Sequence, residues 1–430
     1  MERKYKDSGT KGIGLIPQSW DSRQLGIFFS ENKKANSNLE SVTALQFKYG
    51  EIIQKPNNGR NLSDKDKELL SKYTVIEPGD VIVNGLNLNF DLKSLRIAIA
   101  RENGIITSAY IVLKPRKGVN PNYYNYVLKA LDFQKILHGM GEGIRLTLSY
   151  DELKKLNVPA PAASIQSVIV DYLDKKCVEI DSLISLQEQM IEKLKAYKQS
   201  VITEAVTKGL DPNAKLVPSG IDWIGEIPAG WKVTVLRRFA HIILGKMLQP
   251  SAKFKEDSLE QYICAKDVHF EGIDTTDLKK MYFNQAEKEL YQIQKGDMLV
   301  VEGGAGAAGS CVLRNDLPDT YIQNSIMIVR PKQGIDIRYI QYYEFSLVKK
   351  GYVDYVCNKA TIPHFTKDKL SSMPIPLPPL SEQQAIATYL ESKCTDIDRL
   401  IAVKQQKIEK LKDYKKSVIY EAVTGKTIIE

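Results

Sequence analysis

The sequence is poor in the residues that build disulfide frameworks and metal sites. Its 430 residues include 5 cysteines, with no C-x-x-C pair, and 4 histidines, none of them in an H-E-x-x-H string. An odd, scattered set of cysteines argues against both a disulfide framework and a zinc knuckle. The sequence also has no long apolar run and no apolar stretch at its start. We therefore expect no membrane span, no secretory signal and a cytoplasmic location.

Motifs for nucleotide and cofactor chemistry are also scarce. There is no G-x-x-x-x-G-K-[ST] loop and no Asn-Pro-Pro-Tyr or Asp-Pro-Pro-Tyr string. Gly304–Gly309 spells G-x-G-x-x-G, but no crossover helix is predicted after it and the first half of the chain has no counterpart. We interpret this segment as backbone that approaches another group closely, such as a phosphate or a base edge. Asp80 and Asp297 are interpreted as turn caps, and we expect no catalytic residue, no metal site and no bound cofactor in this chain.

Neither sign of charge dominates strongly. The chain has 60 basic and 52 acidic residues, a net charge of +8. This surplus permits a nucleic-acid partner without requiring one. The length corresponds to about two to four folded units.

What the chain does contain is an internal repeat with a shift of about 217 residues. Ser164–Thr207 aligned on Ser381–Thr424 without a gap shares 26 identities in 44 positions. Fainter matches extend upstream, including Pro159-x-Pro161 with Pro376-x-Pro378. A repeat of this strength predicts two equivalent halves, each a variable domain followed by a nearly invariant helix.

The repeated blocks have a coiled-coil pattern. Apolar residues alternate at spacings of four and three, which is the 3.5-residue period of a coiled coil. The predicted interface residues are Ile180, Ile184, Ile191, Leu194, Val201, Ile397, Ile401, Ile408, Leu411 and Val418. We expect the two helices to pair antiparallel with each other and to relate the variable domains by a pseudo-two-fold axis. Two independent helices that each complete their own domain are the alternative.

The variable domains are expected to be mixed α/β, so the predicted fold class is α+β. Short apolar runs punctuated by Pro-Gly, Lys-Gly and Asn-Gly turns indicate strands, and fewer, tyrosine-rich stretches indicate helices. The predicted boundaries are residues 1–160 for the first variable domain, 161–208 for the first conserved helix, 209–219 for a linker, 220–377 for the second variable domain and 378–426 for the second conserved helix.

Candidate binding residues lie in predicted loops, where the two halves differ most. Asn, Gln, Arg and Lys have the geometry that fits base edges and phosphates. The candidates in the first half are Asn84, Asn87, Asn89, Lys93, Arg96 and Arg145. Those in the second half are Lys246, Gln249, Lys266, His269, Gly303, Gly304, Gln323, Asn324, Lys359 and His364. For each residue taken singly, an ordinary solvated loop is the alternative. Together they suggest two readers with different targets on one frame.

In its repeated motifs the whole chain resembles the specificity subunit of type I restriction–modification systems. Both halves open on Gly-x-Ile-Pro-x-x-Trp and enter the long helix through a Pro-x-Pro segment followed by Gln166 or Gln383. Both helices contain Ile-Asp-x-Leu-Ile and end on Ser-Val-Ile-x-Glu-Ala-Val-Thr. The stretches Tyr262–Lys266 and Val301–Gly304 are also similar to those of the family's target recognition domains.

This resemblance implies a non-catalytic, DNA-binding subunit of a multi-subunit methyltransferase and endonuclease. Each of two target recognition domains would read one half of a bipartite asymmetric site in double-stranded DNA, and the antiparallel coiled coil would set the spacer. Two modification (methyltransferase) subunits and two restriction (helicase-nuclease) subunits are the implied partners. S-adenosylmethionine, ATP and Mg²⁺ are expected on those subunits. A repeat-built protein-interaction scaffold and part of a self-sufficient restriction-methyltransferase are the alternatives.

Overall fold

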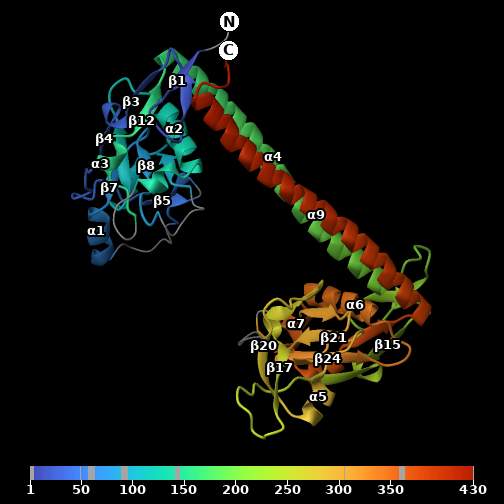
Figure 1. Cartoon of the computed structure of the whole chain (residues 1–430). Coiled ribbons are helices and arrows are strands. Elements are labelled where there is room, and N and C mark those ends of the chain that lie inside the picture. Colours follow the sequence, from blue (N-terminus) through green and yellow to red (C-terminus); the bar gives the residue numbers. More distant parts are fainter. Residues whose placement is uncertain are drawn as a thin grey trace. The chain divides into compact units, whose positions relative to one another are not determined.

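A computed structural model describes residues 4–48, 50–56, 63–88, 95–140, 146–304, 306–357 and 364–429 (Figure 1). The chain forms two compact units. The first unit contains Met1–Glu188 and Gln405–Glu430, and the second contains Gln189–Lys404. Two long helices, α4 (Ala163–Lys208) and α9 (Leu380–Val423), each contribute a segment to both units.

The first unit is built around a four-stranded antiparallel sheet with the order β4-β11-β8-β9. These strands are β4 (Phe29–Glu31), β11 (Ile111–Pro115), β8 (Val81–Val83) and β9 (Ile97–Ile99). Helix α2 (Pro121–Phe133) begins at Asn120, whose side chain accepts a hydrogen bond from the backbone N–H of Tyr123. The apolar side chains of α2 are buried against one face of the sheet.

The second unit repeats this architecture. Its sheet has the order β16-β24-β21-β22, again antiparallel throughout. The strands are β16 (Ala240–Leu244), β24 (Ile326–Pro331), β21 (Met298–Val301) and β22 (Ser310–Val312). Helix α6 (Ile337–Lys349) has the same length as α2 and is capped by Asp336. The duplication in the sequence is therefore a duplication of the fold.

Smaller elements surround the two sheets. In the first unit these are the strand pairs β1 (Tyr5–Asp7) with β2 (Leu15–Pro17), β3 (Asp21–Gln24) with β12 (Asn157–Ala160), β5 (Leu45–Lys48) with β6 (Glu51–Gln54) and β7 (Thr74–Ile76) with β10 (Gly104–Ile106), and the helices α1 (Asp64–Ser71) and α3 (Tyr150–Leu153). In the second unit they are β13 (Leu216–Pro218) with β14 (Glu226–Pro228), β15 (Lys232–Val235) with β25 (Pro374–Leu377), β18 (Val268–His269) with β19 (Gly272–Ile273), and the sheet β20-β17-β23 of Lys279–Phe283, Ser258–Ile263 and Thr320–Ile322. The second unit also contains α5 (Gln285–Tyr291), α7 (Tyr352–Val356) and α8 (Lys367–Ser371).

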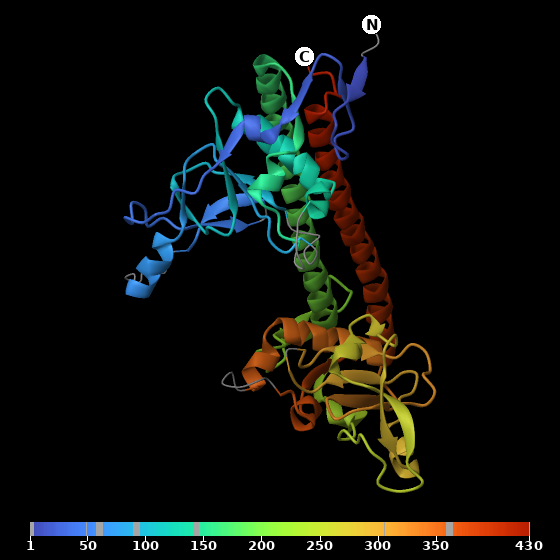
Figure 2. The same ribbon diagram turned by 60° about the vertical axis from the view of Figure 1, so that its left-hand side comes forward.

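Within each unit, the segments of α4 and α9 lie side by side and antiparallel (Figures 1 and 2). In the second unit, Lys198 Nζ lies 2.7 Å from a carboxylate oxygen of Asp398. In the first unit, Lys415 Nζ lies 2.6 Å from Asp181. These residues exchange helices under the 217-residue shift, so the repeat forms the same ion pair twice. Each predicted interface residue is buried or half-buried.

The long helices begin and end in equivalent ways. Gln166 donates a hydrogen bond to the carbonyl oxygen of Pro161, and Gln383 donates one to that of Pro378, both at 2.9 Å. Gly209 and Gly425 follow the helix ends with φ of +76° and +67°, which a glycine adopts without strain. The structure thus confirms the α+β class, the duplicated mixed domains and the antiparallel coiled coil, while the pseudo-two-fold axis stays a prediction. Within the described residues, no helix has both the length and the apolar character needed to cross a bilayer.

Candidate nucleic-acid interface

Several predicted site residues of the second unit meet where strands of its main sheet end. We call Gly245, Lys246, Glu302, Gly303, Gln323, Asn324, Ser325 and His364 the strand-end cluster. Backbone hydrogen bonds hold it together: Asn324 N–H donates to Lys246 O at 2.8 Å, and Glu302 N–H donates to Ser325 O at 2.8 Å. Bridges between Lys246 and Gln323 and between Gly303 and His364 join the remaining segments. Loops from four parts of the sequence therefore form one surface.

Gly303 is required at this place by the close approach of His364. A Cβ atom on Gly303 would lie 2.8 Å from the imidazole Nδ1 of His364, so a larger residue would displace the ring. The close approach at Gly303 is thus made to the protein itself. The interpretation of Gly304–Gly309 as backbone that approaches a phosphate or a base edge stays a prediction.

The G-x-G-x-x-G segment is the connection of a β-hairpin. It joins the antiparallel strands β21 and β22, and Val301 N–H donates to Gly309 O at 2.8 Å across it. Gly304 turns the chain with φ of +88°. A dinucleotide fingerprint opens a helix, whereas β22 follows here, so the segment does not have the geometry of a dinucleotide pocket.

Lys246 and Gln249 do not have the exposed side chains that we predicted. Lys246 is buried, forms an ion pair with Glu287 and lies with Nζ 5.1 Å from the centre of the Phe283 ring. The buried side chain of Gln249 donates to Asp257 at 3.0 Å. The expectation that both reach a partner from open loops is wrong in this structure, because each is used to hold its own loop.

Lys266 and His269 form a separate exposed pair near the hairpin of β18 and β19. The Lys266 ammonium lies 3.0 Å from Asp267, and this hydrogen bond raises the pKa of Lys266. His269 lies on β18 opposite Gly272 with its side chain exposed. Both side chains are accessible to a partner, and their contact with DNA stays a prediction.

In the first unit, the side chain of Arg96 is buried beneath the loop that contains residues 84–87 and donates hydrogen bonds to it. Its side chain is 1% exposed, and its guanidinium donates to the carbonyl oxygens of Asn84 at 3.0 Å and of Leu86 at 2.8 Å. The prediction that Arg96 is exposed for binding is therefore wrong, because the side chain pins residues 84–87 from within the domain. Asn87 is exposed at the tip of this loop, with φ of +52°.

The remaining sequence candidates divide into accessible and undescribed positions. Asn84, Gln323 and Asn324 are half-buried and follow strand ends, and His364, which bridges to Gly303, is exposed. Asn89, Lys93, Arg145 and Lys359 lie outside the described residues. DNA contact by any of these residues stays a prediction.

Asp80 and Asp297, which are equivalent in the two units, each accept a hydrogen bond from the backbone of their own turn. Asp80 accepts a hydrogen bond from Glu77 N–H at 3.1 Å, and Asp297 accepts one from Gln294 N–H at 2.9 Å. Burial raises the pKa of Asp80. Over the described parts of the chain, no group of three or more His, Cys, Asp or Glu side chains is placed to hold a metal ion. Turn capping is therefore the role that the geometry supports.

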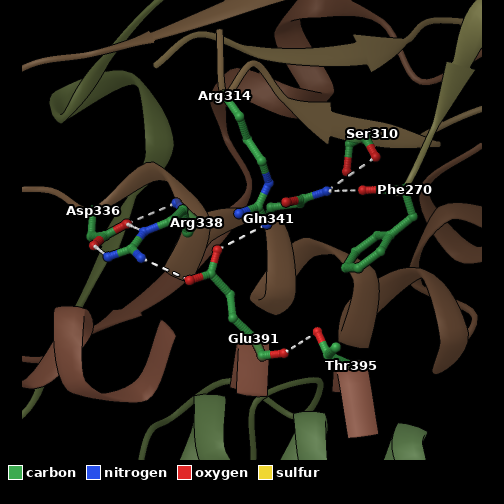
Figure 3. Close-up of polar contacts among 8 residues, drawn as sticks. All are labelled: Phe270, Ser310, Arg314, Asp336, Arg338, Gln341, Glu391 and Thr395. Carbon is green, nitrogen blue, oxygen red and sulfur yellow. Dashed lines mark hydrogen bonds and ion pairs between the residues drawn. The ribbon is translucent and has the colours of Figure 1, made fainter. Parts of the chain in front are cut away.

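Sequence reasoning missed a polar network between the second domain and α9 (Figure 3). Arg338 pairs with Asp336 at 2.6 Å and with Glu391 at 2.9 Å, and Arg314 also pairs with Glu391 at 2.9 Å. The hydrogen bonds that Arg338 donates to Asp336 raise the pKa of Arg338. The partners are too far apart in sequence for spacing to reveal them.

Comparisons with known proteins agree with this architecture. The family described as the type I restriction modification DNA specificity domain matches residues 228–413. The putative type I restriction enzyme MjaX specificity subunit of Methanocaldococcus jannaschii is 26% identical, over 98% of this chain and 97% of its own. The MjaVIII specificity subunit of the same organism is 24% identical, over 98% of this chain and 96% of its own.

Solved structures show the same fold. A chain from a study of complex assembly and conformational transition of the type I R-M system matches with a TM-score of 0.68 at 17% identity, over 95% of this chain and 98% of that chain. The HsdS subunit from Thermoanaerobacter tengcongensis matches with a TM-score of 0.52 at 17% identity, over 96% of this chain and 98% of that chain. Residues 228–413 thus match the DNA specificity domain of type I restriction–modification systems, and nearly the whole chain is similar to specificity subunits of such systems.

Proposed function

We propose that this chain is the DNA sequence-specificity subunit of a type I restriction–modification enzyme and has no catalytic role of its own. The observation that carries the proposal is one frame built twice with different side chains at its strand ends. The order β4-β11-β8-β9 recurs as β16-β24-β21-β22. The residues that follow β8 are Asn84 and Gly85, whereas those that follow β21 are Glu302 and Gly303. Two different readers on equivalent frames suit a bipartite asymmetric site in double-stranded DNA.

The long helices support the docking of two copies of one partner. Leu183 and Leu186, on the α4 segment of the first unit, are 46% and 45% exposed. Their counterparts under the 217-residue shift, Leu400 and Val403 on the α9 segment of the second unit, are 49% and 56% exposed. Exposed apolar side chains on helices often mark protein interfaces. In our proposal the two sets bind two modification subunits, which carry S-adenosylmethionine, while restriction subunits supply ATP- and Mg²⁺-dependent cleavage.

The DNA role is tested by sequencing modified bases. DNA is taken from cells that express this chain with its modification subunit and from cells that lack this chain. The proposal predicts a methyladenine motif of two unlike halves separated by a fixed spacer, present in the first sample alone. A stable complex that methylates no such motif would contradict it. Asn87→Ala and His269→Ala place one exposed change in each domain, so each should relax a different half of the motif.

The docking role is tested by native mass spectrometry of the complex. Leu186→Glu and Val403→Glu each place a charge in one of the two equivalent patches, so each should remove one bound modification subunit. The double variant should remove both. Glu192→Gln, an exposed change on α4 outside the patches, is the control and should leave both subunits bound.

The spacer role is tested by lengthening the coiled coil. One heptad inserted after Glu188 and one before Ile408 would preserve the 3.5-residue register and add about 10 Å to each helix. We expect a spacer about three base pairs longer at 3.4 Å per pair, with both half-sites unchanged. An unchanged spacer in the methylated motif would overturn the idea that the helices measure distance.

A further inference from the structure

In the second unit, the aromatic ring of Phe270 lies between the domain and its coiled-coil segment. The ring centre is 4.9 Å from that of Phe345 and 5.6 Å from that of Tyr342, and Lys198 Nζ lies 6.0 Å from it. The backbone carbonyl oxygen of Phe270 accepts a hydrogen bond from the side chain of Gln341 at 2.8 Å (Figure 3). Phe270 therefore fills a seat made by α6 and α4.

The first unit has a counterpart for each part of this seat. Helices α2 and α6 have equal lengths and align with a shift of 216 residues, which places Tyr123 on Tyr339. The hydroxyls of these two tyrosines lie 3.4 Å and 3.1 Å from the carbonyl oxygens of Val423 and Val206, which are themselves equivalent. The counterparts of Gln341, Tyr342, Phe345 and Lys198 are then Asn125, Tyr126, Lys129 and Lys415.

In the first unit this seat is an open groove. Tyr126, Lys129 and Lys415 line a groove of about 720 Å³ within that unit. Apolar groups on its walls include Phe133, Val178 and Ile184, and the exposed guanidinium group of Arg101 belongs to its lining.

Among the described residues, two polar groups on α2 lack a hydrogen-bond partner: Lys129 lines the groove, and Asn125 directly precedes Tyr126, which also lines it. Lys129 stands where the second unit has Phe345, and it has no hydrogen bond or ion pair among the described residues. Burial and the nearby charge of Lys415 lower the pKa of Lys129. Asn125 is 5% exposed, and its Oδ1 has no hydrogen-bond partner within the described part of the chain. A ligand that brings an anion into the groove would satisfy Lys129.

We propose that this groove binds a segment of another protein chain that presents an aromatic side chain followed by a carboxylate. Phe270 and Glu271 of the second unit are the template: the ring would take the place of Phe270 between Tyr126 and the coiled coil. The carboxylate would pair with Lys129 or Arg101, since a half-buried lysine gains most from a charged partner. The groove combines apolar walls with charges of both signs, since Arg101, Lys129 and Lys412 line it together with Glu51, Asp132 and Asp174. This interaction surface does not depend on the DNA-recognition role.

The test uses a fluorescein-labelled peptide with the sequence of Asp267–Asp274 and the full-length chain, followed by fluorescence anisotropy. We expect saturable binding that weakens at least about tenfold when the peptide carries Phe270→Ala, because buried aromatic anchors dominate such contacts. Lys129→Glu and Arg101→Glu in the chain should each weaken binding, which places the site in the first unit. Lys117→Glu, an exposed change on the turn after β11 and outside the groove, is the matched control.

Three results would overturn the proposal that the groove binds this peptide. Arg101 is exposed, so Arg101→Glu remains informative even if Lys129→Glu unfolds the domain. Absence of saturable binding up to millimolar peptide would overturn the proposal, and so would equal binding by the Phe270→Ala peptide. A duplex of random sequence that binds the chain through Lys129 and Arg101, while the peptide does not, would assign the groove to phosphate groups and also overturn it.

Discussion

Asp80 and Asp297 occupy equivalent turns in the two units but have different partners. Asp80 lies 3.3 Å from the neutral side-chain amide of Asn32, whereas Asp297 accepts hydrogen bonds from the Arg330 guanidinium at 2.9 Å and 2.7 Å. Each aspartate also accepts a hydrogen bond from a backbone N–H group of its own turn. The two units have thus kept the aspartates that accept hydrogen bonds from turn backbone. The residues that donate to these aspartates from elsewhere in each unit, Asn32 and Arg330, have diverged. The Phe270 seat, filled in one unit and open in the other, follows the same rule.

The largest expected effects come from replacing each of the two aspartates by alanine in a separate variant. Asp297→Ala should lower the free energy of unfolding by about 3 kcal/mol, because Arg330 loses a buried ionic partner. Asp80→Ala should cost about 1–2 kcal/mol, since a neutral amide and a backbone N–H lose one acceptor. Chemical denaturation of the full chain followed by circular dichroism measures both. Equal costs would show that the different partners do not matter for stability.

Buried carboxylates offer a second comparison, through pH. Glu344 on α6 accepts a hydrogen bond from Ser310 Oγ at 2.7 Å, and burial raises its pKa from 4.5 to about 8. Between these values the folded protein holds a proton that the unfolded chain has released, so stability falls as pH rises. Glu344→Gln should therefore gain about 3 kcal/mol relative to the natural chain between pH 5 and pH 8.

The equivalent experiment in the first unit uses Asp132 on α2. Burial raises the pKa of Asp132, which accepts a hydrogen bond from Arg96 N–H at 2.8 Å. Asp132→Asn should shift the pH dependence in the same direction as Glu344→Gln. Thermal melting of both variants over this pH range measures the effect, and a pH dependence unaltered by either change would contradict the burial of an ionisable acid.

Opening the filled seat should make the second unit resemble the first. Phe270→Ala is expected to cost about 1.5 kcal/mol, less than for a fully buried phenylalanine, because this ring is half-buried. Calorimetry of the full chain measures the loss. Phe254→Ala changes an exposed phenylalanine in the same unit and is the matched control, for which no comparable loss is expected. A cost near zero for Phe270→Ala would mean that the ring does not fill a seat.

The smallest expected effects are those of the duplicated ion pairs in the coiled coil. Double-mutant cycles to alanine should give coupling energies of about 0.5–1 kcal/mol for each pair. The pair of Lys198 and Asp398 should be the stronger, since the Lys198 side chain is 16% exposed and that of Lys415 is 30% exposed. The reverse order would show that solvent screening does not decide between them.

The sequence predicted most of the fold because the fold is repetitive. Apolar residues at the 3.5-residue period identified the interface segments Ile180–Val201 and Ile397–Val418. The repeat implied two equivalent domains. It predicted individual binding residues less well. Arg96, Lys246 and Gln249 have the chemistry of DNA-contacting side chains, but the structure uses them to hold their own loops. Polar side chains look alike in sequence whether their partner is solvent, DNA or the protein itself.

By itself the sequence determined the duplication, the heptad interface and the family resemblance, since each is a pattern of neighbours along one chain. Only the tertiary structure decided which loops meet at the strand ends, that Gly303 makes room for His364, and that the seat of Phe270 is open beside Lys129. The physical reason is that helix period and turn chemistry act over a few residues. Burial and ion pairing instead depend on side chains that meet from segments tens to hundreds of residues apart.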